Sequence, residues 1–181
     1  MNKKRIALVV GHSAKSKGSY NEEMNVHEYY LNEALAMHTF NMMKITKDLD
    51  PYLVYRKNGY GKLPGEINAT NPDLIISFHH NAVDDKTVQG TETLYYHRSK
   101  KSKEFAKEVQ KALVEALDFN DRKIKPVDSE DAGGYILKYT NAPAVLIEPY
   151  FLSDSEGLIL GASKQLECAI ALTDAVKKYL D

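Results

Sequence analysis

Short apolar runs of strand length alternate with helix-length amphipathic segments along this chain. The strand-like runs cover residues 5–10, 52–56, 73–78, 89–97 and 144–148. Apolar residues at helical spacing predict helices over about 26–47, 100–117 and 163–180, and the pattern assigns no clear element to 134–139. This alternation predicts a single α/β domain over residues 1–181, with a mostly parallel twisted sheet flanked by helices on both faces.

Composition narrows the classes of partner and of site. The 181 residues suffice for one domain, and 24 basic against 25 acidic residues give a net charge of -1. This balance gives no general attraction to nucleic acid or to an anionic membrane. The single cysteine, Cys168, excludes an internal disulfide framework and a cysteine-rich zinc site. A metal site in this chain would therefore use His, Asp and Glu.

The N-terminal segment has a basic start but only a short apolar run. Residues 6–10 are five apolar residues, whereas a secretory signal needs about 7–15. No stretch of the chain approaches the roughly 20 apolar residues of a membrane-spanning helix. We therefore expect a protein made in the cytoplasm without an evident export signal, and no membrane insertion.

Polar residues with useful chemistry follow three of the apolar runs. Gly11-His12 follows IALVV, His79-His80 follows DLIISF, and Glu148 follows AVLI. The carboxyl ends of parallel strands meet at one edge of a sheet, and ligands bind in α/β proteins beyond that edge. The sequence therefore predicts a site that combines imidazole and carboxylate groups.

The two adjacent histidines are distinguished by the alternation of side chains along a strand. One face of the strand carries Ser77, His79 and Asn81, and the other carries Leu74, Ile76, Phe78 and His80. A face with three polar residues is better suited to a site than a face of Leu, Ile and Phe. We therefore expect His79 to be the ligand and His80 to be a packing or hydrogen-bonding residue.

A catalytic zinc ion usually has three protein ligands and one water. His12 and His79 would supply two of the ligands. The third would come from the start of the first long helix, which contains His27, Glu28 and Glu33. In the first turn, the helix dipole favours an ionised carboxylate at Glu28, and Asn32 lies one turn later on the same face. These arguments alone do not separate Glu28 from His27.

Glu148 has a different predicted task, because it ends a buried strand. Partial burial raises the pKa of a carboxyl group, while a nearby metal cation lowers it. A zinc ion lowers the pKa of water to about 7 and polarises a carbonyl group that is attacked. A glutamate beside that water can accept its proton and later deliver it to a leaving amine. Together these parts describe amide hydrolysis.

At these residues the sequence resembles the zinc-dependent N-acetylmuramoyl-L-alanine amidases of bacterial autolysins and phage endolysins. Four motifs match the family pattern in order: Gly11-His12; Glu28 with Asn32; Ser77-x-His79-x-Asn81; and Pro143-Ala144-Val145-Leu146-Ile147-Glu148 with Phe151-Leu152-Ser153. Two departures are Val9-Val10 before Gly11, where members often have Asp-Pro, and Pro149-Tyr150 after Glu148, which could reshape the pocket floor.

The resemblance implies roles and a substrate. It implies one zinc ion held by His12, Glu28 and His79, with Glu148 as the catalytic base. It also implies that the substrate is peptidoglycan, cleaved at the amide between N-acetylmuramic acid and the L-alanine of the stem peptide. Because we identify no export signal and no separate wall-binding domain, we expect a phage or prophage endolysin that reaches the cell wall through a membrane lesion.

Other functions stay open at this stage. A zinc peptidase or carboxypeptidase would use the same chemistry on the stem peptide, and a catalytically silent module would bind the wall without cleaving it. A nucleotide-binding or phosphate-binding α/β protein is disfavoured, because no Gly-rich loop follows a strand in the required context. Arg56 and Asn81 are candidate substrate-groove residues. The sequence indicates neither the oligomeric state nor the host.

Overall fold

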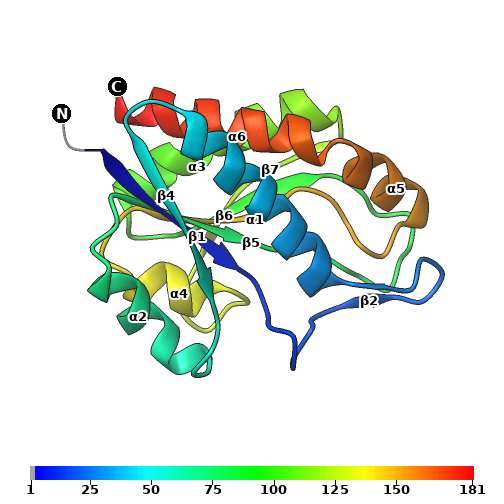
Figure 1. Ribbon diagram of the computed structural model, residues 1–181. Coiled ribbons are helices and arrows are strands. Elements are labelled where there is room, and N and C mark those ends of the chain that lie inside the picture. Colours follow the sequence, from blue (N-terminus) through cyan, green and yellow to red (C-terminus); the bar gives the residue numbers. More distant parts are fainter. Residues whose placement is uncertain (1–2) are drawn as a thin grey trace.

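The computed structural model describes residues 3–181, which form one α/β unit (Figure 1). Its six-stranded sheet has the order β4-β1-β5-β8-β6-β7. The strands in that order are β4 (Leu49–Tyr55), β1 (Lys4–Val10), β5 (Leu74–Phe78), β8 (Ala144–Glu148), β6 (Thr91–Tyr96) and β7 (Asp121–Val127). The predicted α/β class with a mostly parallel sheet is confirmed.

The direction of the strands decides which residues meet at each edge. β4, β1, β5 and β8 run parallel to one another, so all four end at the same edge. β6 pairs antiparallel with β8, and β7 pairs parallel with β6. The last two strands therefore begin at the edge where the other four end. One result is that Glu92, near the start of β6, lies opposite Glu148 at the end of β8.

Helices cover both faces of the sheet, as Figure 1 shows. On one face lie α1 (Glu28–Ile45), α3 (Lys100–Leu117) and α6 (Gln165–Leu180), and on the other lie α2 (Leu63–Ala69) and α4 (Gly134–Tyr139). Side chains alternate accordingly along β5, since Leu74, Ile76 and Phe78 enter the larger core and Ile75 enters the smaller one. Within residues 3–181, every helix lacks the length or the apolar character needed to cross a membrane.

Several short elements were not expected from the hydrophobic pattern. They are the two-stranded hairpin of β2 (Tyr20–Asn21) and β3 (Val26–His27), the 3-10 turn η1 (Tyr60–Lys62), α2, β7 and α5 (Ser155–Ser163). The strand β7 reads DRKIKPV, a charged edge strand that contains a proline. The helix α2 is seven residues long and begins with a proline at its first turn, so it is too short to show a helical period.

We expect the core face of α1 to dominate its contribution to stability. Leu35 is fully buried, so Leu35→Ala should lower the free energy of unfolding by about 2–5 kcal/mol. Ile45 in the same helix is 80% exposed, and Ile45→Ala should change that free energy by no more than about 0.5 kcal/mol. Urea unfolding of the two variants measures both values. Equal losses for the two would contradict the assignment of this helix face to the core.

Candidate functional site

Two imidazoles and one carboxylate converge where β1 and β5 end and α1 begins. His12 follows β1, His79 follows β5, and Glu28 is the first residue of α1. One potential ligand atom from each of these residues lies within 4.8 Å of the other two. The cluster lines a cavity of about 340 Å³, which Glu148 and Arg56 also line. The structure thus gathers His12, Glu28, His79 and Glu148 at one cavity, at the edge that the sequence predicted.

Two glycines make room for this cluster. A Cβ on Gly11 would lie 2.6 Å from Nε2 of His79 and would also collide with the carbonyl oxygen of Phe78. A Cβ on Gly18 would lie 2.5 Å from Oε2 of Glu28 and 2.8 Å from Nε2 of His12. Gly18 has φ +75, a left-handed conformation that favours glycine. His12 itself has φ 64, a conformation that is uncommon for a residue with a side chain.

The carboxylate of Glu28 is buried and accepts hydrogen bonds from several segments. Oε1 lies 2.9 Å from Nδ1 of His79, and Oε2 lies 2.9 Å from Nε2 of His12. The backbone N–H of Ser19 donates to Oε2 at 3.2 Å. Burial alone would raise the pKa of the Glu28 carboxyl, but the hydrogen bonds from His12 and His79 outweigh it and hold that pKa well below its usual range. Glu28 is therefore ionised, which is the form that binds metal.

Asn32 and His80 support Glu28 from the core side. The side-chain amide of Asn32 donates to Oε1 of Glu28 at 3.4 Å and to the carbonyl oxygen of Gly11 at 3.2 Å. Its Oδ1 lies 2.7 Å from Nδ1 of His80. Burial lowers the pKa of His80 to about 3, so the ring is neutral and donates to Asn32. His80 is thus a buried hydrogen-bonding residue, as the alternation along the strand predicted.

Other residues considered from the sequence lie outside the cluster. The ring of His27 stacks against Tyr20 at 4.4 Å between centroids, so of the two neighbours only Glu28 joins His12 and His79. Tyr150 is fully buried and packs against the ring of His80 at 4.4 Å. It therefore lies in the core beneath His80.

Glu148 enters the cavity from the end of β8. Its Oε2 is shielded from solvent and has no hydrogen-bond partner among residues 3–181. Burial raises the pKa of the Glu148 carboxyl well above its usual value, and the negative charges of Glu28 and Glu92 raise it further. The structure therefore holds one carboxyl group at the cavity that has a high proton affinity and an oxygen free to bond.

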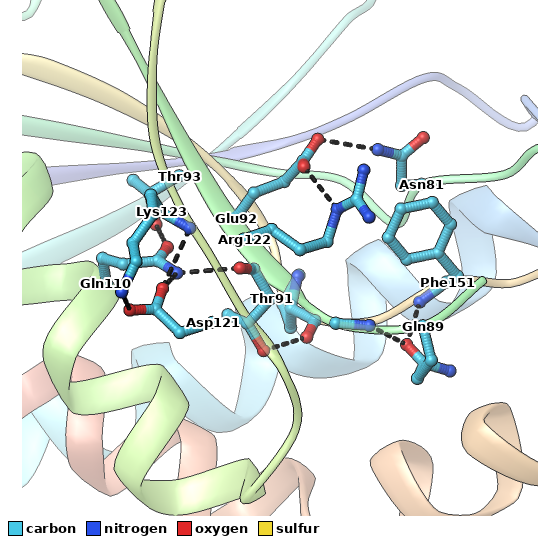
Figure 2. Close-up of polar contacts among 12 residues, drawn as sticks. Asn81, Gln89, Thr91, Glu92, Thr93, Gln110, Asp121, Arg122, Lys123 and Phe151 are labelled. Carbon is cyan, nitrogen blue, oxygen red and sulfur yellow. Dashed lines mark hydrogen bonds and ion pairs between the residues drawn. The ribbon is translucent and has the colours of Figure 1, made fainter.

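Asn81 lines the same cavity, but its side chain is engaged with the protein. Its Nδ2 donates to Oε1 of Glu92 at 2.8 Å (Figure 2). Its Oδ1 accepts from the backbone N–H of Ala82 at 2.9 Å. Glu92 in turn forms an ion pair with Arg122 at 2.8 Å. The sequence pattern does not single out Glu92 or Arg122. The only signal is a glutamate inside the run predicted as a strand over 89–97.

Arg56 is placed at the cavity as the sequence suggested. It follows β4, and its guanidinium carbon lies 5.7 Å from the ring centroid of Tyr60, a second lining residue that sequence reasoning missed. This pair gives the cavity a cationic and aromatic part of its lining.

The sequence of this chain also matches a known protein family. Residues 6–178 match the family described as N-acetylmuramoyl-L-alanine amidase. The chain belongs to this amidase family. The match includes His12, Glu28, His79 and Glu148, so the gathered residues all lie within the amidase domain.

Individual amidases resemble the chain over different lengths. The germination-specific N-acetylmuramoyl-L-alanine amidase of Bacillus subtilis is 31% identical over 115 residues, which are 62% of this chain and 47% of that protein. The N-acetylmuramoyl-L-alanine amidase LytC of the same species is 34% identical over 85 residues, 46% of this chain and 16% of LytC. The chain thus spans less than half the length of these two relatives. The crystal structure of an N-acetylmuramoyl-L-alanine amidase from Clostridium difficile 630 aligns over 100% of this chain and 98% of its own, with a TM-score of 0.88 and 27% identity.

We expect Gly18→Ala to weaken metal binding at the cluster. The added Cβ meets the side chains of both Glu28 and His12, and φ +75 adds backbone strain. The affinity for Zn²⁺, measured by competition with a chelating dye, should fall by about tenfold or more, since displaced ligands and their supports commonly cost this much. The matched control is Gly61→Ala, because a Cβ on Gly61 meets nothing within 4 Å. Equal affinities for the two variants would contradict the role given to Gly18.

Proposed function

We propose that this protein is a zinc-dependent hydrolase that cleaves the amide between N-acetylmuramic acid and the L-alanine of the peptidoglycan stem peptide. The observation that carries the proposal is the convergence of His12, Glu28 and His79 beside the free carboxyl group of Glu148, within an amidase family match. The cell wall is the corresponding place of action.

The donor set fits one zinc ion. Two imidazoles and one carboxylate are a ligand set that catalytic zinc sites use, with the fourth position left for water or substrate. In this chain they are His12, His79 and Glu28, and the carboxylate is held ionised. Asn32 hydrogen bonds with Glu28 from behind, the kind of support that orients a ligand. Gly18 leaves the space beside the cluster open.

Glu148 moves the proton in the proposed reaction. When bound, the zinc ion supplies a Lewis acid that lowers the pKa of water and polarises the carbonyl of the scissile amide. Glu148, which lines the cavity, accepts the proton of the attacking water on its carboxylate and then delivers it to the nitrogen of the leaving L-alanine. Burial and the negative charges of Glu28 and Glu92 raise the pKa of the Glu148 carboxyl. A bound cation would lower that pKa again, so that the group can start as the base.

The cavity wall formed by Arg56 and Tyr60 is proposed to hold the substrate beside the scissile bond. A guanidinium group suits carboxylate and carbonyl oxygens, and an aromatic ring offers an apolar face to a sugar or peptide. Both residues line the cavity that holds the metal-ligand candidates. Neither is needed for metal binding in this proposal.

The endolysin role is a separate part of the proposal. An endolysin would lyse walls without assistance once it reaches them, so purified protein should clear a suspension of isolated walls. An amidase that needs an activator or partner would cleave small muramoyl-peptides and leave the walls turbid. This comparison therefore tests the lytic role independently of the amidase reaction.

We expect two substitutions to separate the metal ligand from the base. Glu148→Gln should keep one zinc per chain and lower kcat on muramoyl-peptides by about 10²–10⁴-fold, because a positioned general base contributes that much. His79→Ala should lose both the zinc and the activity. His80→Gln is the matched control for the neighbouring position. It should keep zinc, because the His80 ring bonds with Asn32 and its hydrogen bond to Glu28 comes from the backbone N–H, which the substitution retains. Zinc content by atomic absorption and kcat on the same preparations give the result.

The new termini decide between the candidate reactions. The proposed amidase releases a lactyl carboxylate on muramic acid and a free amine on L-alanine. A zinc peptidase or carboxypeptidase would instead release termini within the stem peptide, and a silent wall-binding module would release none while still sedimenting with walls. Mass spectrometry of digested walls distinguishes these outcomes, and either of the last two would overturn the proposal.

A further inference from the structure

A second glutamate lies beside Glu148 on the neighbouring strand. Glu92 of β6 and Glu148 of β8 are directly paired across the sheet. Alternation along the strands places both side chains on the face that carries α2 and α4, where Leu94 and Leu146 also lie. Like charges directly opposite in a sheet are destabilising. One of the two carboxylates must therefore bind a cation or hydrogen-bond donors if the other is to remain without a partner.

Arg122 and Asn81 satisfy Glu92. Arg122 donates from Nε to Oε2 of Glu92 at 2.8 Å, and Asn81 donates from Nδ2 to Oε1 at 2.8 Å, as Figure 2 shows. The guanidinium also lies over the ring of Phe151, with its carbon 4.8 Å from the centroid. Glu92 is 8% exposed and has both oxygens bonded, whereas Oε2 of Glu148 has no partner among residues 3–181.

We propose that Arg122 is a positioning residue for the hydrolysis, acting through Glu92. By forming an ion pair with Glu92, Arg122 fixes that carboxylate at the sheet. Glu148 is then the carboxyl group at the cavity that has an oxygen without a partner among residues 3–181. It also keeps Glu92 in place as the hydrogen-bond acceptor of Asn81, which lies two residues after His79 in the chain. This inference rests on the proposed function, because it assigns Arg122 a part in that reaction.

The local backbone of β7 directs Arg122 toward the site and its neighbour away from it. The register between β6 and β7 shifts between Thr91 and Thr93, and Lys123 has φ 71. At this bulge, Arg122 turns to Glu92, while Lys123 forms an exposed pair with Asp121 at 2.6 Å. Adjacent cations of one strand thus have different surroundings, and Lys123 is a matched control for Arg122.

Loss of Arg122 would leave a nearly buried carboxylate with Asn81 as its remaining side-chain donor. An uncompensated buried charge is strongly unfavourable, so Glu92 would reorient toward water or toward the cavity. That movement would release Asn81 and disturb the segment that carries His79 and the strand pair that carries Glu148. A displacement of about 1 Å in the groups that react can lower turnover by about a hundredfold. Binding of a large substrate, which uses many other contacts, should change less.

The first comparison is between single variants, with soluble muramoyl-peptide as substrate. R122Q should lower kcat by about tenfold to a hundredfold with little change in KM or zinc content, and the unpaired Glu92 should also lower its Tm. R122K keeps the charge and should recover part of that loss, and K123Q should match the wild type. Unchanged kcat in R122Q would overturn the proposal. A wild type that releases no L-alanine amine would instead overturn the proposed function.

The second comparison tests whether Arg122 acts through Glu92. The E92Q side chain carries no charge that needs a counterion, so the Arg122→Gln change should have little further effect in the E92Q background. We expect kcat of E92Q/R122Q to equal that of E92Q within about twofold, as coupled sites give non-additive effects. An equal loss from R122Q in both backgrounds would overturn the proposal, because Arg122 would then act independently of Glu92. If R122Q fails to fold, the effect of R122K in the wild-type background and in the E92Q background gives the same decision.

Discussion

The site depends on burying the ionised carboxylate of Glu28. Such a charge is unfavourable in the interior unless donors surround it. Its donors come from separate parts of the chain: His12 and Ser19 follow β1, Asn32 lies one turn along α1, and His79 and His80 follow β5. Satisfying this one group therefore fixes the loop after β1, the start of α1 and the end of β5 relative to one another. The same arrangement brings together the atoms offered to a metal ion.

Sheet topology provides the frame for this arrangement. The strands β1, β5 and β8 are parallel neighbours, so their ends deliver His12, His79 and Glu148 to one edge. The reversal of β6 adds a residue that a wholly parallel sheet would place elsewhere. In a parallel β6, the end near Tyr96 would lie at this edge, whereas the antiparallel strand brings Glu92 there. The charge chemistry of the site thus depends on the direction of one strand.

These features separate what the sequence could predict from what it could not. Hydrophobic runs and their polar ends predicted the sheet, the edge and the gathering of His12, His79 and Glu148, and alternation along one strand separated His79 from His80. The position of Glu28 in a first turn did not by itself separate it from His27. The family resemblance selected Glu28, and the fold shows His27 stacked on Tyr20 instead. Glu92, Arg122 and Gly18 were missed, because their roles depend on strand order, strand direction and a close approach between loops. Such contacts are long-range and leave no period in the chain.

Three carboxylates at this edge differ in their surroundings rather than in their chemistry. Glu28 is surrounded by imidazoles and N–H donors, which keep it ionised. Glu92 has both oxygens bonded by Arg122 and Asn81, which keep it in the sheet. Glu148 is half-buried, with one shielded oxygen that has no partner among residues 3–181, and burial and its two negative neighbours raise its pKa. In the proposed reaction, these different environments would let Glu28 bind the metal, Glu92 fix Asn81 and Glu148 move a proton. Because the hydrogen bonds of Glu28 and Glu92 occupy those two carboxylates, Glu148 is the carboxyl group that remains available for proton transfer in the proposed reaction.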